Sequence, residues 1–183
     1  MIGTHKGFMM KLAWGKKVGP AFRDKVFAIC DGFTWNRETH ASWLMSCMAF
    51  ESGETFSPSI RNAAGSGATG LIQFMPSTAQ GLGTTTAELA EMTALDQLDY
   101  VQKYFRPYAS RIGTLSDMYM AILMPKFVEQ PEDSVMFLDP KISYRQNAGL
   151  DANRDGKITK AEAASKVRAK FDKGMLDRYS LEV

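Results

Sequence analysis

The chain has 183 residues, of which 45% are hydrophobic and 23% are charged, and this composition is typical of a globular protein. The length suits one domain with a substantial core and a small appendage. A formal net charge of +2 is too close to neutral for nucleic acid to be expected as the main partner. No stretch reaches the ~20 apolar residues of a membrane-spanning helix, so no membrane span is expected.

Residues 1–19 are expected to form an N-terminal extension. Lys6, Lys11, Lys16 and Lys17 interrupt its apolar residues, so this segment does not have the continuous apolar core of a signal peptide. If the substrate lies outside the cytoplasm, we expect another route to deliver the protein.

The two cysteines, Cys30 and Cys47, leave two interpretations open. In an oxidising compartment they could form one disulfide bridge. Both also lie among apolar residues, where a free cysteine is commonly a small core side chain.

Helical periodicity is clearest in the first third of the chain. Apolar side chains recur at helical spacing over residues 20–31 and predict a helix that ends near Gly32. A second helix is expected to begin after Thr34 or Asn36, either of which can cap it, and to run to Gly53.

Glycine, serine and alanine dominate residues 52–72, which favours turns and a short β-hairpin over a helix. Three helices are predicted to follow this segment. The first is opened by Pro76, the second spans residues 86–92, and the third is capped by Thr93 and runs to Tyr104.

The next part of the chain alternates between one helix and irregular structure. Ser116 is expected to cap a helix that Pro125 ends. The segment from there to Gly149 is predicted to be mostly loop, and residues 139–150 suit a helix poorly because they contain Pro140 and Gly149.

The following residues have the spacing of an EF-hand calcium loop. Ca²⁺ takes about six to eight oxygen ligands, which here would include a backbone carbonyl and a water as well as side chains. The loop positions are occupied by Asp151, Asn153, Asp155, Gly156, Lys157, Thr159 and Glu162. A polar turn capped by Thr159 is the alternative, but it does not explain Glu162. Because the lead-in is irregular, we expect a structural Ca²⁺ that pins the C-terminal helix.

Glu51 is the candidate catalytic residue. Cys47 and Met48 precede it by four and three residues, so its carboxylate lies on the apolar face of the predicted helix. Desolvation there would raise its pKa and suit it to act as a general acid. No Asp or Glu occurs between Glu54 and Glu88, so the facing loop supplies no second carboxylate. A solvated glutamate at a helix end is the alternative interpretation of Glu51.

The stretch ESGETFSP, followed by GATGLIQFMPSTA, resembles the signature of the soluble lytic transglycosylase family over about residues 38–82. The resemblance implies a lysozyme-like fold and cleavage of the MurNAc–GlcNAc β-1,4 bond of peptidoglycan, which leaves a 1,6-anhydro end. It also implies that Glu51 is the catalytic acid and base, and that Ser52, Gln73 and Met75 contact the substrate. Some phage and bacterial enzymes of this kind carry an EF-hand loop.

The chain departs from the family pattern in three places. Extra residues stand between the Glu-Ser pair and the following aromatic-x-Pro. Ala64 stands where many members have a serine before the hairpin, with Asn62 or Ser66 as possible substitutes, and the usual Ala-Tyr-Asn-Ala-Gly motif is not present in its expected form. Its nearest counterparts are Tyr119 and the run from Tyr144 to Gly149, which includes Asn147. Either tyrosine could place its hydroxyl near the acid.

These observations predict a mostly α, lysozyme-like fold with a small β-hairpin lining the substrate cleft and a C-terminal EF-hand-like loop and helix. The expected parts are an extension (1–19), the transglycosylase domain (20–149) and the calcium segment (150–183), packed on the same domain. The expected protein is a monomeric, phage-type lyase that acts on peptidoglycan strands in the bacterial cell wall, at the periplasm. A hydrolytic muramidase and a non-catalytic, calcium-dependent wall-binding protein are the alternatives.

Overall fold

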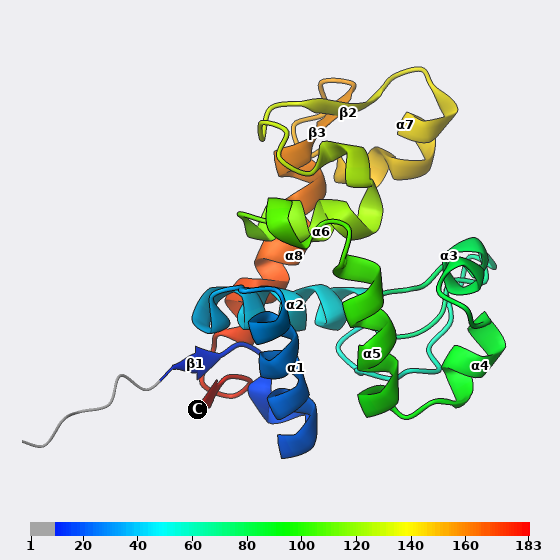
Figure 1. The fold of residues 1–183 in the computed structure, drawn as a ribbon. Coiled ribbons are helices and arrows are strands. Elements are labelled where there is room, and N and C mark those ends of the chain that lie inside the picture. Colours follow the sequence, from blue (N-terminus) through cyan, green and yellow to red (C-terminus); the bar gives the residue numbers. More distant parts are fainter. Residues whose placement is uncertain (1–9) are drawn as a thin grey trace, which may run out of the picture.

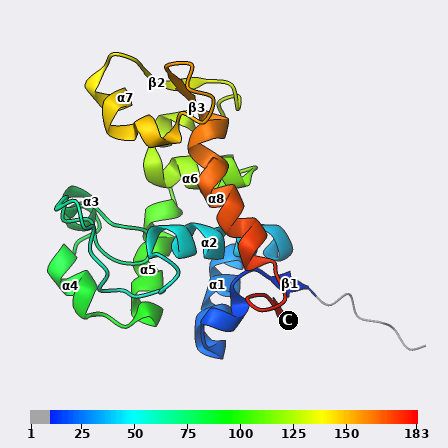
Figure 2. The same ribbon diagram turned by 180° about the vertical axis from the view of Figure 1, so that it is seen from behind.

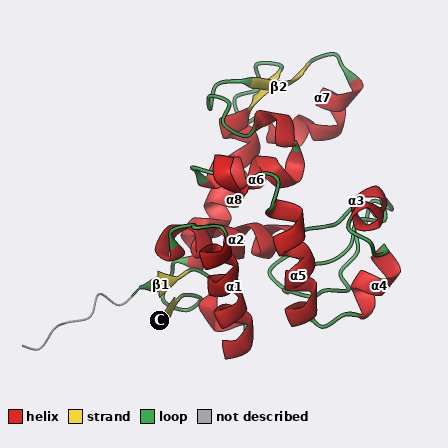
Figure 3. Ribbon diagram, viewed as in Figure 1, coloured by secondary structure: helices red, strands yellow, loops and turns green. Residues whose placement is uncertain are grey.

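The structure, a computed structural model, describes residues 10–183 (Figure 1). Most of this part of the chain is helical, and two small antiparallel sheets complete it (Figure 3). The mostly α character predicted from the sequence is therefore confirmed. The short 3₁₀ segments are η1 (Gly15–Lys17), η2 (Ala109–Arg111), η3 (Pro125–Phe127) and η4 (Ala148–Leu150).

The first two helices form where the sequence predicts them. Helix α1 (Pro20–Gly32) ends at its glycine, and α2 (Arg37–Glu51) begins after Asn36. The Asn36 side chain accepts a hydrogen bond from the Thr39 amide at 3.0 Å, so Asn36 is the cap. Both cysteines are buried and unpaired, which confirms the interpretation as core side chains.

Three helices follow the glycine-rich segment, as expected from its proline and threonine signals. They are α3 (Pro76–Gly81), α4 (Thr86–Glu91) and α5 (Ala94–Phe105). Thr93 caps α5 by accepting a hydrogen bond from the Asp96 amide at 3.1 Å. The buried side of α5 packs against α1.

Helix α6 (Leu115–Leu123) is the innermost helix, since every residue from 115 to 121 is buried. The predicted cap, Ser116, is wrong. Thr114 accepts the hydrogen bond of the Asp117 amide at 3.0 Å, so the helix begins earlier than predicted. Ser116 is instead buried inside the helix, where its hydroxyl accepts a hydrogen bond from Arg168.

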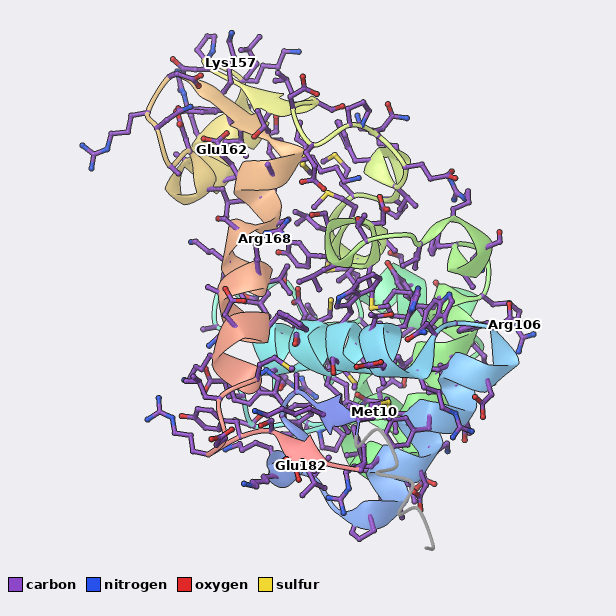
Figure 4. The ribbon with its side chains drawn as sticks, turned by 90° about the vertical axis from the view of Figure 1, so that its left-hand side faces the viewer. Met10, Arg106, Lys157, Glu162, Arg168 and Glu182 are labelled. Atoms are coloured by element: carbon purple, nitrogen blue, oxygen red, sulfur yellow. The ribbon has the colours of Figure 1, made fainter. Side chains whose placement is uncertain are left out.

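The C-terminal helix α8 (Lys160–Gly174) holds the molecule together along one side. It packs against both α2 and α6 (Figure 2). Figure 4 shows α8 running past the end of α2, with Arg168 on it. Ala163, Ala164 and Val167 form its buried face. The face of α8 that packs on these helices is thus part of the main core.

The N-terminal extension was predicted too long. Residues 1–9 lie outside the described residues, but residues 10–19 belong to the fold. Strand β1 (Lys11–Leu12) pairs with β4 (Leu181–Glu182), so the start of the described chain lies beside its end (Figure 1). Trp14 is fully buried, and its indole N–H donates to the Lys170 carbonyl at 3.0 Å.

The segment before the calcium loop is more regular than predicted. It contains β2 (Val135–Leu138) and helix α7 (Ile142–Asn147). Strand β2 pairs antiparallel with β3 (Lys157–Thr159) of the loop, and Phe137 and Ile158 meet there as buried partners. Pro140 does not prevent α7 because it precedes the helix rather than interrupting it.

One buried ion pair joins α8 to α6. The Lys160 ammonium donates to Asp117 at 2.6 Å and to the Gln130 carbonyl at 2.7 Å. Only 2% of the lysine side chain and 7% of the aspartate side chain are exposed. Removing one partner of such a pair leaves an uncompensated buried charge.

We therefore expect Lys160→Met to lower the free energy of unfolding by about 3–5 kcal/mol. The midpoint of urea unfolding measures this. Lys166→Met, an exposed position on the same helix, is the matched control and should change stability by less than about 0.5 kcal/mol. A loss at Lys160 no larger than that of the control would contradict the prediction.

Candidate active site

Glu51 is the last residue of α2, and its side chain is mostly buried. Burial raises the pKa of its carboxyl from the ordinary value of 4.5 to about 7. Within residues 10–183 it forms no ion pair. The carboxyl is therefore protonated in a large fraction of molecules near neutral pH, as a general acid must be.

The charge of Glu51 contributes to the raised pKa of two tyrosines. Burial raises the pKa of Tyr119, and a Glu51 carboxylate raises it further. The Tyr119 ring stands perpendicular to that of Phe50 with centroids 5.4 Å apart. Burial also raises the pKa of Tyr104, with smaller contributions from Tyr108 and Glu51. The tyrosine beside the acid is thus Tyr119, joined by Tyr104, which the sequence interpretation missed.

Tyr144 and Asn147 lie elsewhere, on α7 (Figure 1). The Tyr144 hydroxyl donates to Asp151 at 2.6 Å, in the calcium loop. The Asn147 amide donates to the Ser143 carbonyl of its own helix at 2.8 Å. Their assignment as substrate contacts close to Glu51 is wrong. Tyr144 thus contacts the loop that follows α7, and Asn147 bonds within α7 itself.

Glu54 is directed away from Glu51 and not simply into solvent. Its backbone has φ = 68°, and its carboxylate forms ion pairs with Lys170 and Lys173 of α8. The hydrogen bonds from these two lysines lower the pKa of Glu54. The nearest acid in the sequence therefore stays ionised and fastens the turn after α2 to the C-terminal helix.

Ser52 serves the turn after α2 rather than the surface. It is fully buried, and its hydroxyl accepts a hydrogen bond from the Phe56 amide at 2.9 Å. Its predicted role as a substrate contact is wrong for this reason. The hydroxyl stabilises the bend that carries the chain from α2 into the glycine-rich loop.

The glycine-rich segment is a compact loop rather than the predicted hairpin of two strands. Thr69 forms isolated bridges to Arg61 on one side and to Phe74 on the other. Gly67 and Gly70 have φ values of 76° and 87°, which interrupt the extended backbone that a hairpin needs.

Gln97 holds this loop in place. It is fully buried on α5, and its side-chain oxygen accepts a hydrogen bond from the Leu71 amide at 2.7 Å. Its amide group donates to the carbonyls of Pro58 and Leu89. A Cβ at Gly70 would lie 2.3 Å from the Gln97 oxygen, so only glycine fits there. Gln97 thus anchors the loop at two backbone groups, those of Pro58 and Leu71, and joins it to α4 through Leu89.

Gln73 and Met75, the predicted sugar contacts, line a small hollow beside this loop. The Gln73 amide donates to the carbonyls of Ile60 and Gly70, which orients the side chain. Met75 is 45% exposed. Tyr104 lines the same hollow, and the charge of Glu51 contributes to its raised pKa.

A second, larger hollow of about 420 Å³ continues from the first. The two share Thr78, Tyr104 and Ile122, and the second extends to Tyr108 and Pro125. Together they form a groove, which we call the acid groove, between α3, α5 and the end of α6. Exposed aromatic and apolar side chains of this kind suit stacking on sugar rings.

The calcium loop is folded around its first aspartate. Asp151 accepts hydrogen bonds from the amides of Arg154 at 2.7 Å and Gly156 at 3.0 Å. Thr159 and Glu162 form a capping box at the start of α8. The other carboxylate oxygen of Glu162, Oε1, is buried without a hydrogen-bond partner.

This orphaned oxygen fits an EF-hand, in which the last residue of the loop gives its carboxylate to the cation. Within residues 10–183 no three Asp, Glu, His or Cys side chains already converge as a metal site. The loop would, however, draw part of its ligands from Asn153, the Lys157 carbonyl and a water on Thr159. Its donor chemistry suits a hard cation such as Ca²⁺.

No protein-family model matches the chain, and no curated protein matches it significantly. Along the described residues, every helix is too short or too polar to cross a membrane.

The burial of Glu51 predicts a pH dependence of stability. Because its folded pKa of about 7 exceeds 4.5, the folded state binds the proton more tightly, and stability is lost as pH rises between these values. We expect Glu51→Gln to be more stable than wild type at pH 8 by roughly 1–3 kcal/mol.

The difference should disappear near pH 4, where both side chains are neutral. Urea unfolding at the two pH values measures it, with the exposed Glu91→Gln as the control. Equal stability of wild type and Glu51→Gln at pH 8 would show that the carboxylate is well solvated.

Proposed function

We propose that the protein is a peptidoglycan lytic transglycosylase with a lysozyme-like fold and Glu51 as its single acid and base. The observation that carries the proposal is the setting of Glu51: a desolvated carboxyl beside Tyr119, with its sequence neighbour Glu54 bound to α8. The motif resemblance at the same residues supports the family assignment. The bacterial cell wall would be the place of action.

A single acid is sufficient if the substrate supplies the second group. Glu51, protonated, donates its proton to the glycosidic oxygen as the C1–O bond breaks. The acetamido oxygen of the same muramic acid stabilises the cationic C1. The Glu51 carboxylate then takes the proton of the 6-hydroxyl as that oxygen bonds to C1. The products are a free GlcNAc hydroxyl and a 1,6-anhydro ring, and Glu51 is protonated again.

Glycosidases that use water normally need a second carboxylate as a base or nucleophile. Desolvation raises the pKa of Glu51, and the nearest acid in the sequence, Glu54, is paired with Lys170 and Lys173 of α8. This favours the anhydro route over a hydrolytic muramidase. Tyr119 and Tyr104 supply the neutral, partly apolar surroundings that keep the acid protonated.

Digestion of peptidoglycan followed by mass spectrometry of the released muropeptides tests the proposal. Wild type should release 1,6-anhydro ends. Glu51→Gln should lose at least about 100-fold in rate, since an acid–base group contributes about 10²–10⁴-fold. Glu54→Gln is the matched control and should remain active. Reducing MurNAc ends would overturn the transglycosylase, and full activity of Glu51→Gln would overturn the acid.

We also propose that the EF-hand-like loop holds a structural Ca²⁺. Asp151, Asn153, Asp155 and Glu162 would bind it with their side-chain oxygens, and Lys157 with its carbonyl. The loop lies between α7 and the start of α8, so bound cation would stabilise the helix that packs on α2 and α6.

Calcium should therefore raise the melting temperature. At a free concentration of about 100 times Kd the stabilisation is about 2.7 kcal/mol, or roughly 5–10 °C for a domain of this size. Asp155→Ala, which removes the ligand oxygen, should lose this response, while Asp172→Ala, at an exposed carboxylate on α8, should keep it. Melting curves that coincide with calcium and with chelator would refute the site.

A further inference from the structure

A hollow of about 490 Å³ lies beyond the acid groove, between η3, β2 and α7. We call it the lysine hollow. Its lining residues are Met124, Lys126, Val135, Met136, Phe137, Leu138, Lys141 and Ser143. Neither the cleavage chemistry nor the calcium loop uses it.

The charged side chains that line this hollow are all basic. Lys126 and Lys141 are its only charged lining residues, although the chain as a whole has 20 acidic and 22 basic side chains. Both lysines are exposed, and neither forms an ion pair with any residue from 10 to 183. Two ammonium groups are thus available to an anionic ligand.

The other lining residues include several exposed aliphatic side chains. Val135 and Leu138 are 46% and 42% exposed, and the neighbouring Ile142 is 73% exposed. A ligand that fits this surface has carboxylates to meet the lysines and small apolar groups to cover the aliphatic side chains.

The lysine hollow adjoins the acid groove. Pro125 lines the far end of the acid groove, and its neighbours Met124 and Lys126 line the lysine hollow. Pro125 and Lys126 belong to η3, and Met124 is its N-cap residue. A molecule that lies in the acid groove can therefore extend into the lysine hollow across η3.

We propose that the lysine hollow binds the stem peptides of peptidoglycan through their carboxylates. This inference rests on the proposed function. Each stem peptide is attached to the lactyl group of a muramic acid, so it leaves the glycan close to the bond that Glu51 would cleave. Its free carboxylates match Lys126 and Lys141, and its alanine methyl groups match Val135 and Leu138. The protein would then prefer strands that carry peptides over bare glycan.

Two substrates test the proposal: soluble glycan strands with their stem peptides, and the same strands after an amidase has removed the peptides. We expect Lys126→Gln/Lys141→Gln to lower kcat/KM on peptide-bearing strands by about three- to tenfold, mainly through KM, since exposed ion pairs contribute modestly. On stripped strands the change should stay within about twofold. The loss should shrink at high salt.

The matched control is Lys17→Gln/Lys166→Gln, which removes the same charge from two exposed lysines outside the acid groove and the lysine hollow. It should leave both substrates unaffected. An equal loss on both substrates by the Lys126/Lys141 variant, or no loss on either, would overturn peptide binding.

Binding without turnover separates this proposal from the proposed function. In a Glu51→Gln background, peptide-bearing strands should bind about three- to tenfold more weakly when Lys126 and Lys141 are also replaced. Retention of this difference with no anhydro product from wild type would overturn the transglycosylase only. Anhydro product that depends on Glu51, with no difference in binding, would overturn the lysine hollow only.

Discussion

The buried ion pair of Lys160 and Asp117 is the constraint on which the two ends of the molecule depend. Asp117 stands in the first turn of α6, two residues before Tyr119, and Lys160 opens α8 directly after the calcium loop. Two charges that are almost fully desolvated tolerate little displacement, because each would be left unpaired. The pair therefore fixes α8 against α6, and α6 in turn holds a tyrosine beside Glu51. Packing of α8 on α2 completes the frame around the acid.

Glu51 and Glu54 show how surroundings separate two nearby acids. Glu51 is the last residue of α2 and Glu54 lies in the turn after it. Burial raises the pKa of Glu51, while hydrogen bonds from two lysines lower the pKa of Glu54. The turn at Ser52 and the positive φ of Glu54 produce this difference, since they rotate the second carboxylate onto α8. Glu51 is thus the acid that can be protonated near neutral pH, while Glu54 stays ionised on α8.

Local signals in the sequence were sufficient to predict the helices whose capping and terminating residues lie at their own ends. Asn36 caps α2 and Gly32 ends α1, as predicted, because each acts on its own backbone. Predictions failed where distant contacts decide. Nothing near Gln97 in the sequence indicates that its amide anchors a loop beginning at Pro58. Tyr104 of α5 reaches α6 by donating its hydroxyl to the Ala121 carbonyl, a contact between residues that are distant in the sequence.

The calcium loop illustrates the same limit from the other side. The spacing of its ligand residues could be recognised in the sequence. The strand that pairs with β3 of the loop could not. EF-hand loops have a short strand that needs an antiparallel neighbour, because an isolated edge leaves backbone groups unpaired. Here β2 fills that place, twenty residues upstream, through Phe137 and Ile158. The loop is thus completed within its own chain rather than by a second hand. Since β2 also forms the wall of the lysine hollow, the element that supports the cation loop is the one that would meet the stem peptide. If both sites bind as proposed, order in one would favour order in the other, because both include the same strand.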